Sequence, residues 1–132
     1  MADYTKVNLR EVEDMAPKFG LAPGLQSRFA REALGLKNSG MSLFKAQPGF
    51  RVPFGHKHNT QEEIYVVLAG SVRIKLEDEI VELKTWDAVR VPPDVRRGIE
   101  AGPDGAEILA VGAPNTGMGD AEMLQDFWPQ EG

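Results

Sequence analysis

Residues 41–114 consist of short apolar segments separated by glycine, proline and acidic turns. Within 71–83, apolar and basic side chains alternate until the acidic turn 77–79 interrupts them, a pattern that predicts a β-hairpin. Short segments with such frequent turn signals are typical of an antiparallel sandwich or barrel and not of a βαβ sheet. The strands that we expect besides this hairpin are 41–46, 62–70, 87–93, 97–102 and 106–114, with a turn at 102–105 between the last two.

The composition bounds the size and the chemistry of the chain. Its 132 residues, 42% of them hydrophobic, match one domain with a core of its own. Cysteine is absent, which excludes disulfides, thiolate ligands and a cysteine nucleophile. The 20 acidic residues against 15 basic ones give a net charge of −5, which disfavours binding to nucleic acid or to an anionic membrane.

The pattern along the chain also suggests its organisation. The first residues lack the apolar core of a signal peptide and no segment is long enough to span a bilayer, so we expect a cytoplasmic protein. We divide the chain into an N-terminal extension, 1–40, a barrel core, 41–114, and a C-terminal tail, 115–132. In the extension, 7–12 and 25–32 are candidate edge strands that widen the sheet or cross to a second subunit.

One short helix is expected in the C-terminal tail. It would start near Asp120 and end before Pro129, because proline cannot continue a helix. The apolar side chains that would pack together as a patch on this helix are Met123, Leu124, Phe127 and Trp128.

The two histidines of the chain, His56 and His58, are one residue apart and precede two glutamates. On an extended segment their side chains point to the same face, and Lys57 points away. Glu63 opens an apolar strand, where a carboxylate is costly unless it is paired or coordinated. Two imidazoles and one carboxylate form the facial arrangement used for Fe(II), which also suits Mn, Co, Ni or Zn.

These three side chains therefore predict a site for a divalent transition metal, with the ligands His56, His58 and Glu63. The alternative is a surface loop that carries two solvated histidines and no ion. Glu62, of opposite parity, is expected to face solvent. Tyr65 shares the parity of Glu63, together with Val67 and Ala69, and is a candidate ligand-binding residue or simple cavity lining.

The stretch 56–70, "HKHNTQEEIYVVLAG", resembles the first motif of the cupin superfamily. That motif has HxH, three or four residues, Glu, six residues and Gly, and His56, His58, Glu63 and Gly70 fit this order. The second cupin motif is degenerate in this chain. Proline is kept at Pro92, but the positions of the motif's glycines, histidine and asparagine hold Trp86, Asp94, Arg97 and Ala101.

The resemblance implies an all-β protein, an antiparallel jelly-roll β-barrel that is typically a homodimer. It also implies a metal held by three histidines and one glutamate. It does not select a function, because the superfamily includes dioxygenases, isomerases, epimerases, decarboxylases, sugar-binding regulators and storage proteins.

Arg97 occupies the position of the third cupin histidine and, being always charged, cannot be a ligand. In one alternative, the three remaining ligands hold the metal and Arg97 binds an anionic group of a small organic molecule. In another, Arg97 pairs with Glu63 and replaces the lost cation. In a third, Arg97 lies solvated beside Arg96 at the barrel mouth. The pairs Arg73/Lys75 and Arg96/Arg97 are expected on exposed faces.

Two functions from different classes follow. The first is a small metal-dependent cupin, an oxygenase or isomerase, that binds a small organic ligand, with an anionic group on the ligand as one alternative. The second is a metal-free cupin that binds a small molecule or has a regulatory role, with Arg97 paired to Glu63. A dimeric structural or regulatory partner domain without pocket chemistry is a third interpretation.

Overall fold

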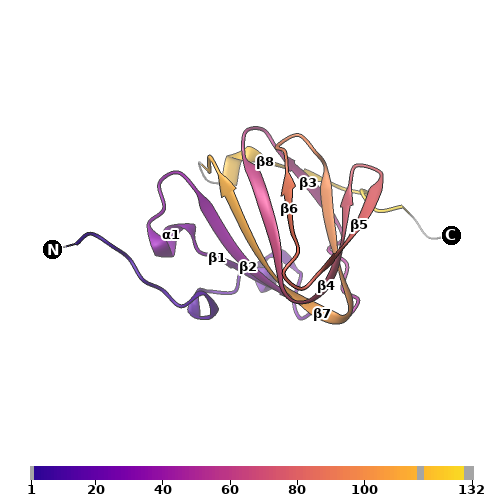
Figure 1. Cartoon of the computed structure of the whole chain (residues 1–132), viewed down its shortest axis with the longest axis horizontal. Coiled ribbons are helices and arrows are strands. Elements are labelled where there is room, and N and C mark those ends of the chain that lie inside the picture. Colours follow the sequence, from indigo (N-terminus) through magenta and orange to yellow (C-terminus); the bar gives the residue numbers. More distant parts are fainter. Residues whose placement is uncertain (1, 116–117, 130–132) are drawn as a thin grey trace.

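The computed structural model describes residues 2–115 and 118–129 and confirms the predicted all-β fold. These residues form one curled antiparallel sheet, a jelly-roll barrel, with helix limited to single turns (Figure 1). No helix within these two ranges is long and apolar enough to cross a membrane. The elements are η1 (Leu9–Glu11), η2 (Ala16–Phe19), β1 (Leu25–Phe29), α1 (Arg31–Leu34), β2 (Gly40–Ala46), β3 (Gly55–His58), β4 (Glu62–Leu76), β5 (Glu79–Lys84), β6 (Ala88–Val91), β7 (Arg97–Ala113), η3 (Met118–Asp120) and β8 (Ala121–Leu124).

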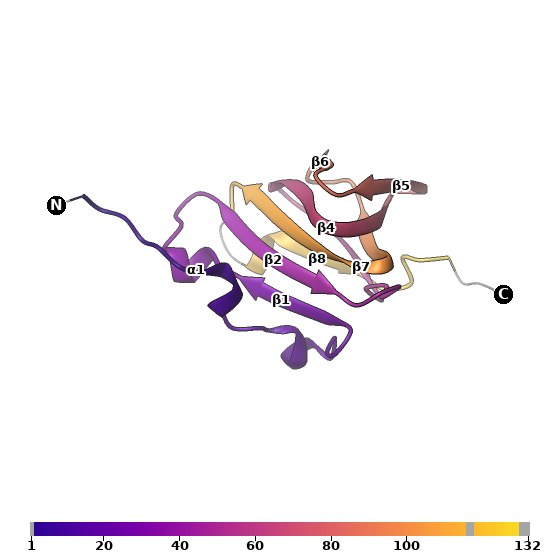
Figure 2. The ribbon, with the colours of Figure 1, turned by 60° about the horizontal axis from the view of Figure 1, so that its bottom comes forward.

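Strands β4 and β7 are the centre of the sheet, since they pair from Glu62 opposite Ala113 to Leu76 opposite Arg97. β7 also pairs with β2, which in turn pairs with the edge strand β1, while β4 also pairs with β5 and β6. Strand β3 lies between β7 and β8. Figure 2 shows β1 and β2 together on one side of the molecule and β5 and β6 on the other. The predicted hairpin is confirmed as β4 and β5.

The two central strands bend where glycine allows it. Gly70 in β4 and Gly105 in β7 have φ of +72° and +78°, values that glycine adopts without strain. A Cβ on Gly70 would lie 2.0 Å from the carbonyl oxygen of Gly105, so the strands also touch here. The predicted turn at 102–105 is therefore wrong, because these residues continue β7 through the bend. Likewise, the expected strand 62–70 does not end at Gly70 but runs on to Leu76.

The barrel interior is lined by apolar side chains of β4 and β7, among them Tyr65, Val67, Val72, Ile74 and Ile108, each at most 3% exposed. Val72 and Ile74 therefore face inward, as their alternation with basic residues predicted. The expected exposure of Lys75 is wrong, since this residue is only 8% exposed. Its ammonium lies 3.7 Å from the centre of the Phe127 ring and donates to the carbonyl of Glu77.

One of the two candidate edge strands of the N-terminal extension is a strand in the structure. β1 pairs along its length with β2, from Leu25 opposite Ala46 to Phe29 opposite Ser42. The segment 7–12 is instead a single 3-10 turn. The Asn8 side chain accepts a hydrogen bond from the backbone N–H of Arg10, a local bond that favours the turn over a strand.

The C-terminal tail forms the strand β8, so the predicted helix near Asp120 is wrong. Residues 121–124 pair with β3, which gives their backbone groups partners that helix propensity alone cannot reveal. The aromatic residues that follow also find partners on the barrel. Phe127 packs against Gly98, where a Cβ would lie 2.9 Å from its ring, and Trp128 Nε1 donates to the carbonyl of Val52.

We predict that Gly98→Ala loosens the tail. The added methyl group would displace Phe127 and lower the free energy of unfolding by about 1 kcal/mol or more. In a Trp86→Phe background, which removes the tryptophan that is 74% exposed, the fluorescence of Trp128 should shift to longer wavelength. Gly119→Ala is the matched control, since a methyl group added there would have nothing within 4 Å of it. Equal stability and emission in the two variants would contradict the packing described.

Candidate metal centre

Strand β3 places both histidines on one face. Because β3 is hydrogen-bonded to β7 on one side, at His56 opposite Arg97, and to β8 on the other, its backbone is held extended. The rings of His56 and His58 therefore lie together, with centroids 5.1 Å apart. Lys57 turns away from them and its Nζ lies 3.6 Å from a carboxylate oxygen of Glu122.

Glu63, at the start of β4, faces the two histidines. Its Oε1 lies 3.0 Å from His58 Nε2 and 3.4 Å from His56 Nε2. The same oxygen accepts a hydrogen bond from the Tyr65 hydroxyl at 2.6 Å and one from Arg97 Nη1 at 3.0 Å. The structure thus brings the predicted metal ligands, Tyr65 and Arg97 together around a single carboxylate oxygen.

The surroundings keep Glu63 ionised. Burial would raise the pKa of this carboxyl group, but hydrogen bonds from His56, His58 and Tyr65 hold its pKa well below the usual range. Burial lowers the pKa of His56, against the opposing effect of Glu63, which favours the neutral imidazole that metals bind. Burial and the nearby carboxylate raise the pKa of Tyr65, so its hydroxyl stays a donor.

Arg97 is fully buried, so neither its expected exposure nor the alternative of a solvated residue at the barrel mouth holds. Besides its contact with Glu63, its Nη2 donates to the carbonyl of Pro92 at 2.5 Å. Its Nε is buried and finds no hydrogen-bond partner within the described parts of the chain. Glu62, in contrast, is exposed as predicted and lies 3.6 Å from Arg90.

The donor set fits a divalent transition metal. One atom each of His56, His58 and Glu63 lies within 4.8 Å of the others, so one ion could contact all three. Two ligand atoms each bound about 2.1 Å from an ion at a right angle lie about 3 Å apart, close to the 3.0 and 3.4 Å found here. Among the described residues, none donates to the second oxygen of Glu63, Oε2.

The sequence did not predict the two side chains that lie near Nδ1 of His58, those of Gln61 and Asp120. Gln61 Nε2 lies 3.1 Å from His58 Nδ1, and the carboxylate of Asp120 lies 3.3 Å from the same nitrogen. Gly112 makes room for the glutamine, since a Cβ there would lie 2.2 Å from its Oε1. Gln61 stands between two predicted ligands and could have been suspected, whereas nothing local marks Asp120, which β8 brings in from the tail.

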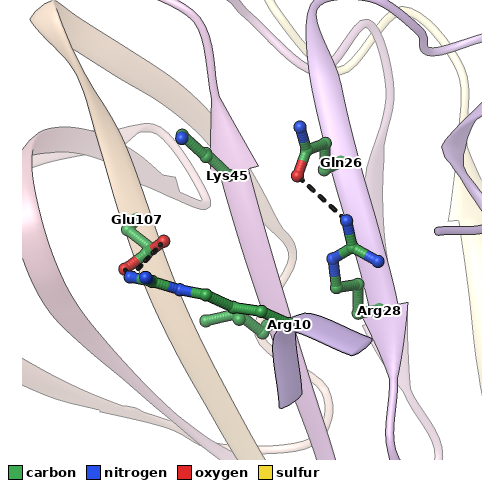
Figure 3. A pocket seen from close by; sticks show the side chains of 6 residues that line it. Arg10, Gln26, Arg28, Lys45 and Glu107 are labelled. Atoms are coloured by element: carbon green, nitrogen blue, oxygen red, sulfur yellow. Dashed lines mark hydrogen bonds and ion pairs between the residues drawn. The ribbon is translucent and has the colours of Figure 1, made fainter. Parts of the chain in front are cut away.

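A second group of charged side chains lies on the outer face of β1, β2 and β7, around a cavity of about 200 Å³ (Figure 3). Arg10 is bound there by Glu107 at 3.0 Å, and Arg28 contacts the Gln26 side chain at 3.3 Å. Lys45 completes the group. Oxygen atoms of the chain itself already contact both guanidinium groups. The histidine site is therefore the stronger candidate for binding a ligand.

A family model described as "Cupin domain" matches residues 42–112. The chain belongs to the cupin family. The site described above lies within the matched range, apart from Asp120. This cupin has a known relative in "Uncharacterized protein MJ1618" of Methanocaldococcus jannaschii, 37% identical over 71 residues. These residues are 53% of this chain and 57% of the relative, so the match spans little more than half of either protein.

Solved structures share the fold. A cupin protein from Bacteroides fragilis superposes with a TM-score of 0.71 and 26% identity, over 89% of this chain and 90% of that one. Oxalate decarboxylase from Bacillus subtilis superposes with a TM-score of 0.78 and 20% identity, over 94% of this chain and 33% of that one. At such identity the second likeness concerns the fold alone, and it supports the jelly-roll assignment of this cupin.

We predict that Glu63→Gln destabilises the protein by about 3 kcal/mol at pH 7, because Arg97 would stay buried without its counter-charge. A carboxyl whose pKa is lowered by folding contributes stability above its unfolded pKa, about 4.3, and loses it as the pH falls through the folded value. The deficit of the variant should therefore be constant from pH 7 to about pH 5 and shrink under more acidic conditions.

Urea unfolding at several pH values measures this deficit. Glu62→Gln, a neighbouring change at an exposed carboxylate, should alter stability little at any pH. A deficit of equal size in the two variants, or one that grows towards acidic pH, would contradict the ionised state assigned to Glu63.

Proposed function

We propose that this cupin binds one divalent transition metal through His56, His58 and Glu63 and uses it to hold a small organic ligand. The observation that supports this most is the convergence of two imidazole nitrogens and one ionised carboxylate within 4.8 Å in a largely buried site. The metals that suit this donor set are Fe, Mn, Ni, Co and Zn.

Three protein ligands leave coordination positions open, which is typical of catalytic and not of purely structural metal sites. A metal bound here would supply Lewis-acid chemistry, or redox chemistry if it is iron, manganese or cobalt. Oxygenase or isomerase chemistry is the enzymatic class that we propose on this basis. The chain's own contribution is to keep Glu63 charged, to keep His56 neutral and to hold Arg97 beside them.

The charge of the site favours an anionic ligand. Among the described residues of the site, the carboxylates of Glu63 and Asp120 are balanced by the guanidinium of Arg97 alone, so a divalent cation would leave an excess of one positive charge in a poorly solvated space. We propose that a carboxylate or similar group on the ligand offsets this charge, with Arg97 and the Tyr65 hydroxyl as its partners. The buried Nε of Arg97 is a donor suited to this role, and the hydroxyl of Tyr65, which donates to Glu63 in this structure, would have to turn towards the ligand.

The ion pair between Arg97 and Glu63 supports a second candidate. Because Nη1 already lies 3.0 Å from Oε1, the guanidinium can serve as the cation of the site. This cupin would then bind a small molecule, or act in regulation, without a metal.

A homodimer is also part of the proposal. Neighbouring strands β4 and β7 carry an apolar group on the outer face of the sheet, with Ile64 opposite Val111 and Val66 opposite Leu109. Ile64 is 42% exposed and the other three are half-buried. A second subunit covering this group would remove apolar surface from water.

We predict that protein purified without an affinity tag carries about one equivalent of transition metal per chain, measured by plasma mass spectrometry. Glu63→Gln and His58→Ala should each lose it, because two protein ligands do not hold a labile ion well. Glu62→Gln should keep it, since this neighbouring carboxylate faces solvent. Wild-type protein that stays metal-free after dialysis against Fe²⁺, Mn²⁺ or Zn²⁺ would favour the metal-free alternative.

We also predict that Arg97→Met raises the affinity for Zn²⁺ by about tenfold or more. The change removes a buried positive charge that lies 3.0 Å from a ligand oxygen and would repel the ion. Competition with a chromogenic chelator measures the affinity. Arg96→Met, at an exposed neighbour, is the control and should leave the affinity unchanged. An unchanged or lower affinity in Arg97→Met would show that the guanidinium does not compete with the metal.

A further inference from the structure

Asp120 lies outside the residues that the family model matches, and it contacts His58 on the side of the ring that faces away from Glu63. It ends the turn η3, directly before β8, and is 7% exposed. Its Oδ2 lies 3.3 Å from Nδ1 of His58, the ring nitrogen opposite to the one that faces Glu63. A buried carboxylate on the far nitrogen of a metal-binding histidine is the arrangement that commonly orients such ligands.

If Nε2 of His58 binds a metal, the two ring nitrogens must differ in protonation. Nε2 must then present its lone pair, so the proton of the neutral ring must be on Nδ1, where it requires an acceptor. Gln61 cannot provide one. Its Oε1 accepts from Asn115 Nδ2 at 3.0 Å, which leaves the NH2 group towards His58, at 3.1 Å. Within residues 2–115 and 118–129, the carboxylate of Asp120, 3.3 Å away, is the acceptor group that lies near Nδ1.

Gln61 and Asp120 therefore favour opposite tautomers of the same ring. The glutamine NH2 group donates to Nδ1 and so favours the proton on Nε2, which would block metal binding there. The carboxylate of Asp120 lies 3.3 Å from Nδ1, where it would accept a proton of that nitrogen, so it favours the opposite tautomer. While no ion is bound, Oε1 of Glu63, 3.0 Å from Nε2, also favours the proton on Nε2. Of these three groups, Asp120 is the one that favours the proton on Nδ1, which metal binding at Nε2 requires.

The carboxylate of Asp120 is itself firmly held. Oδ1 accepts from Thr60 Oγ1 at 2.8 Å and from the Thr60 backbone N–H at 3.0 Å, and Oδ2 accepts from the Gln61 N–H at 3.0 Å. Burial would raise the pKa of Asp120, but these hydrogen bonds lower it, so the group is charged. Pairing of β8 with β3, at Ala121 opposite His58, fixes the backbone directly beside it.

We propose that Asp120 is a positioning residue that favours the tautomer of His58 with its proton on Nδ1, against the effect of Gln61 and Glu63, and so prepares Nε2 for the metal. This role rests on the metal-binding function proposed above. It makes the docked C-terminal segment a part of the metal centre, because β8 carries the carboxylate to the histidine.

Asp120→Asn tests the proposal with Zn²⁺ as the probe. The amide can turn its NH2 group towards Nδ1, which would favour the wrong tautomer, so we expect the affinity for Zn²⁺ to fall by about 10- to 100-fold. Thr60→Val is the matched control. It removes a hydrogen bond to the same carboxylate, on Oδ1, but leaves Oδ2 beside His58, so the affinity should stay within about twofold of wild type.

A second measurement reads the tautomer without a metal. Long-range ¹⁵N NMR spectra of the histidine rings distinguish a protonated Nδ1 from a protonated Nε2, and amide spectra show whether each variant is folded. In metal-free Asp120→Asn, the Nε2-protonated form of His58 should increase over wild type and over Thr60→Val. The Zn²⁺ affinity and the tautomer, measured together, distinguish a failure of the proposed metal binding from a failure of the proposed role of Asp120.

If wild-type protein does not bind Zn²⁺ but the tautomer shifts in Asp120→Asn, the metal-binding function fails and the orienting role of Asp120 stands. If wild type binds Zn²⁺ and folded Asp120→Asn matches Thr60→Val in both affinity and tautomer, the role of Asp120 is overturned. A loss of affinity of the same size in Asp120→Asn and Thr60→Val, without a change of tautomer, would also overturn it, because the effect would then be that of a loosened loop.

Discussion

One carboxylate oxygen organises the interior of this cupin. Oε1 of Glu63 has two imidazole nitrogens, a tyrosine hydroxyl and a guanidinium within 3.4 Å, inside a barrel whose other lining is mostly apolar. A charge so placed is stable only because these donors replace its lost hydration. The same oxygen is therefore both the anchor of the buried Arg97 and a candidate metal ligand, and these two roles compete for one negative charge.

The fold supplies this geometry through strand pairing. β3 is held on both edges, so that His56 and His58 share one face, and β4 carries Glu63 and Tyr65 to the same interior. The bend at Gly70 and Gly105 lets β4 and β7 remain paired while the sheet curls. The tail then closes the back of the site, where Asp120 contacts the histidine that is most deeply buried.

Periodicity and motif spacing were enough to predict much of this site. Side-chain parity places His56 and His58 on one face of their segment, and Glu63 and Tyr65 on one face of theirs. The motif spacing predicted that the two faces meet. The pairing of Arg97 with Glu63 was one of three alternatives for that arginine. It could not be chosen from the sequence, because the orientation of a long charged side chain depends on the cavity around it.

Features that depend on distant pairing were not predictable in this way. The tail has the apolar spacing of a short helix, but β3 offers an open edge and the segment becomes a strand. Residues 102–105 have the composition of a turn, yet β7 runs through them with a bend at Gly105, because the residues on either side, Ala101 and Ala106, pair with β4. The contact of Asp120 with His58 depends on both the strand β8 and the Thr60 turn, and no local pattern encodes it.

The most direct test of the account is a crystal structure of protein soaked in Mn²⁺, Fe²⁺ or Zn²⁺, with anomalous diffraction recorded at the absorption edge of the metal. The account predicts an anomalous peak about 2.1 Å from Nε2 of His56, Nε2 of His58 and a carboxylate oxygen of Glu63. The absence of a peak, with the guanidinium of Arg97 still closed on Glu63, would contradict the assignment of a metal centre.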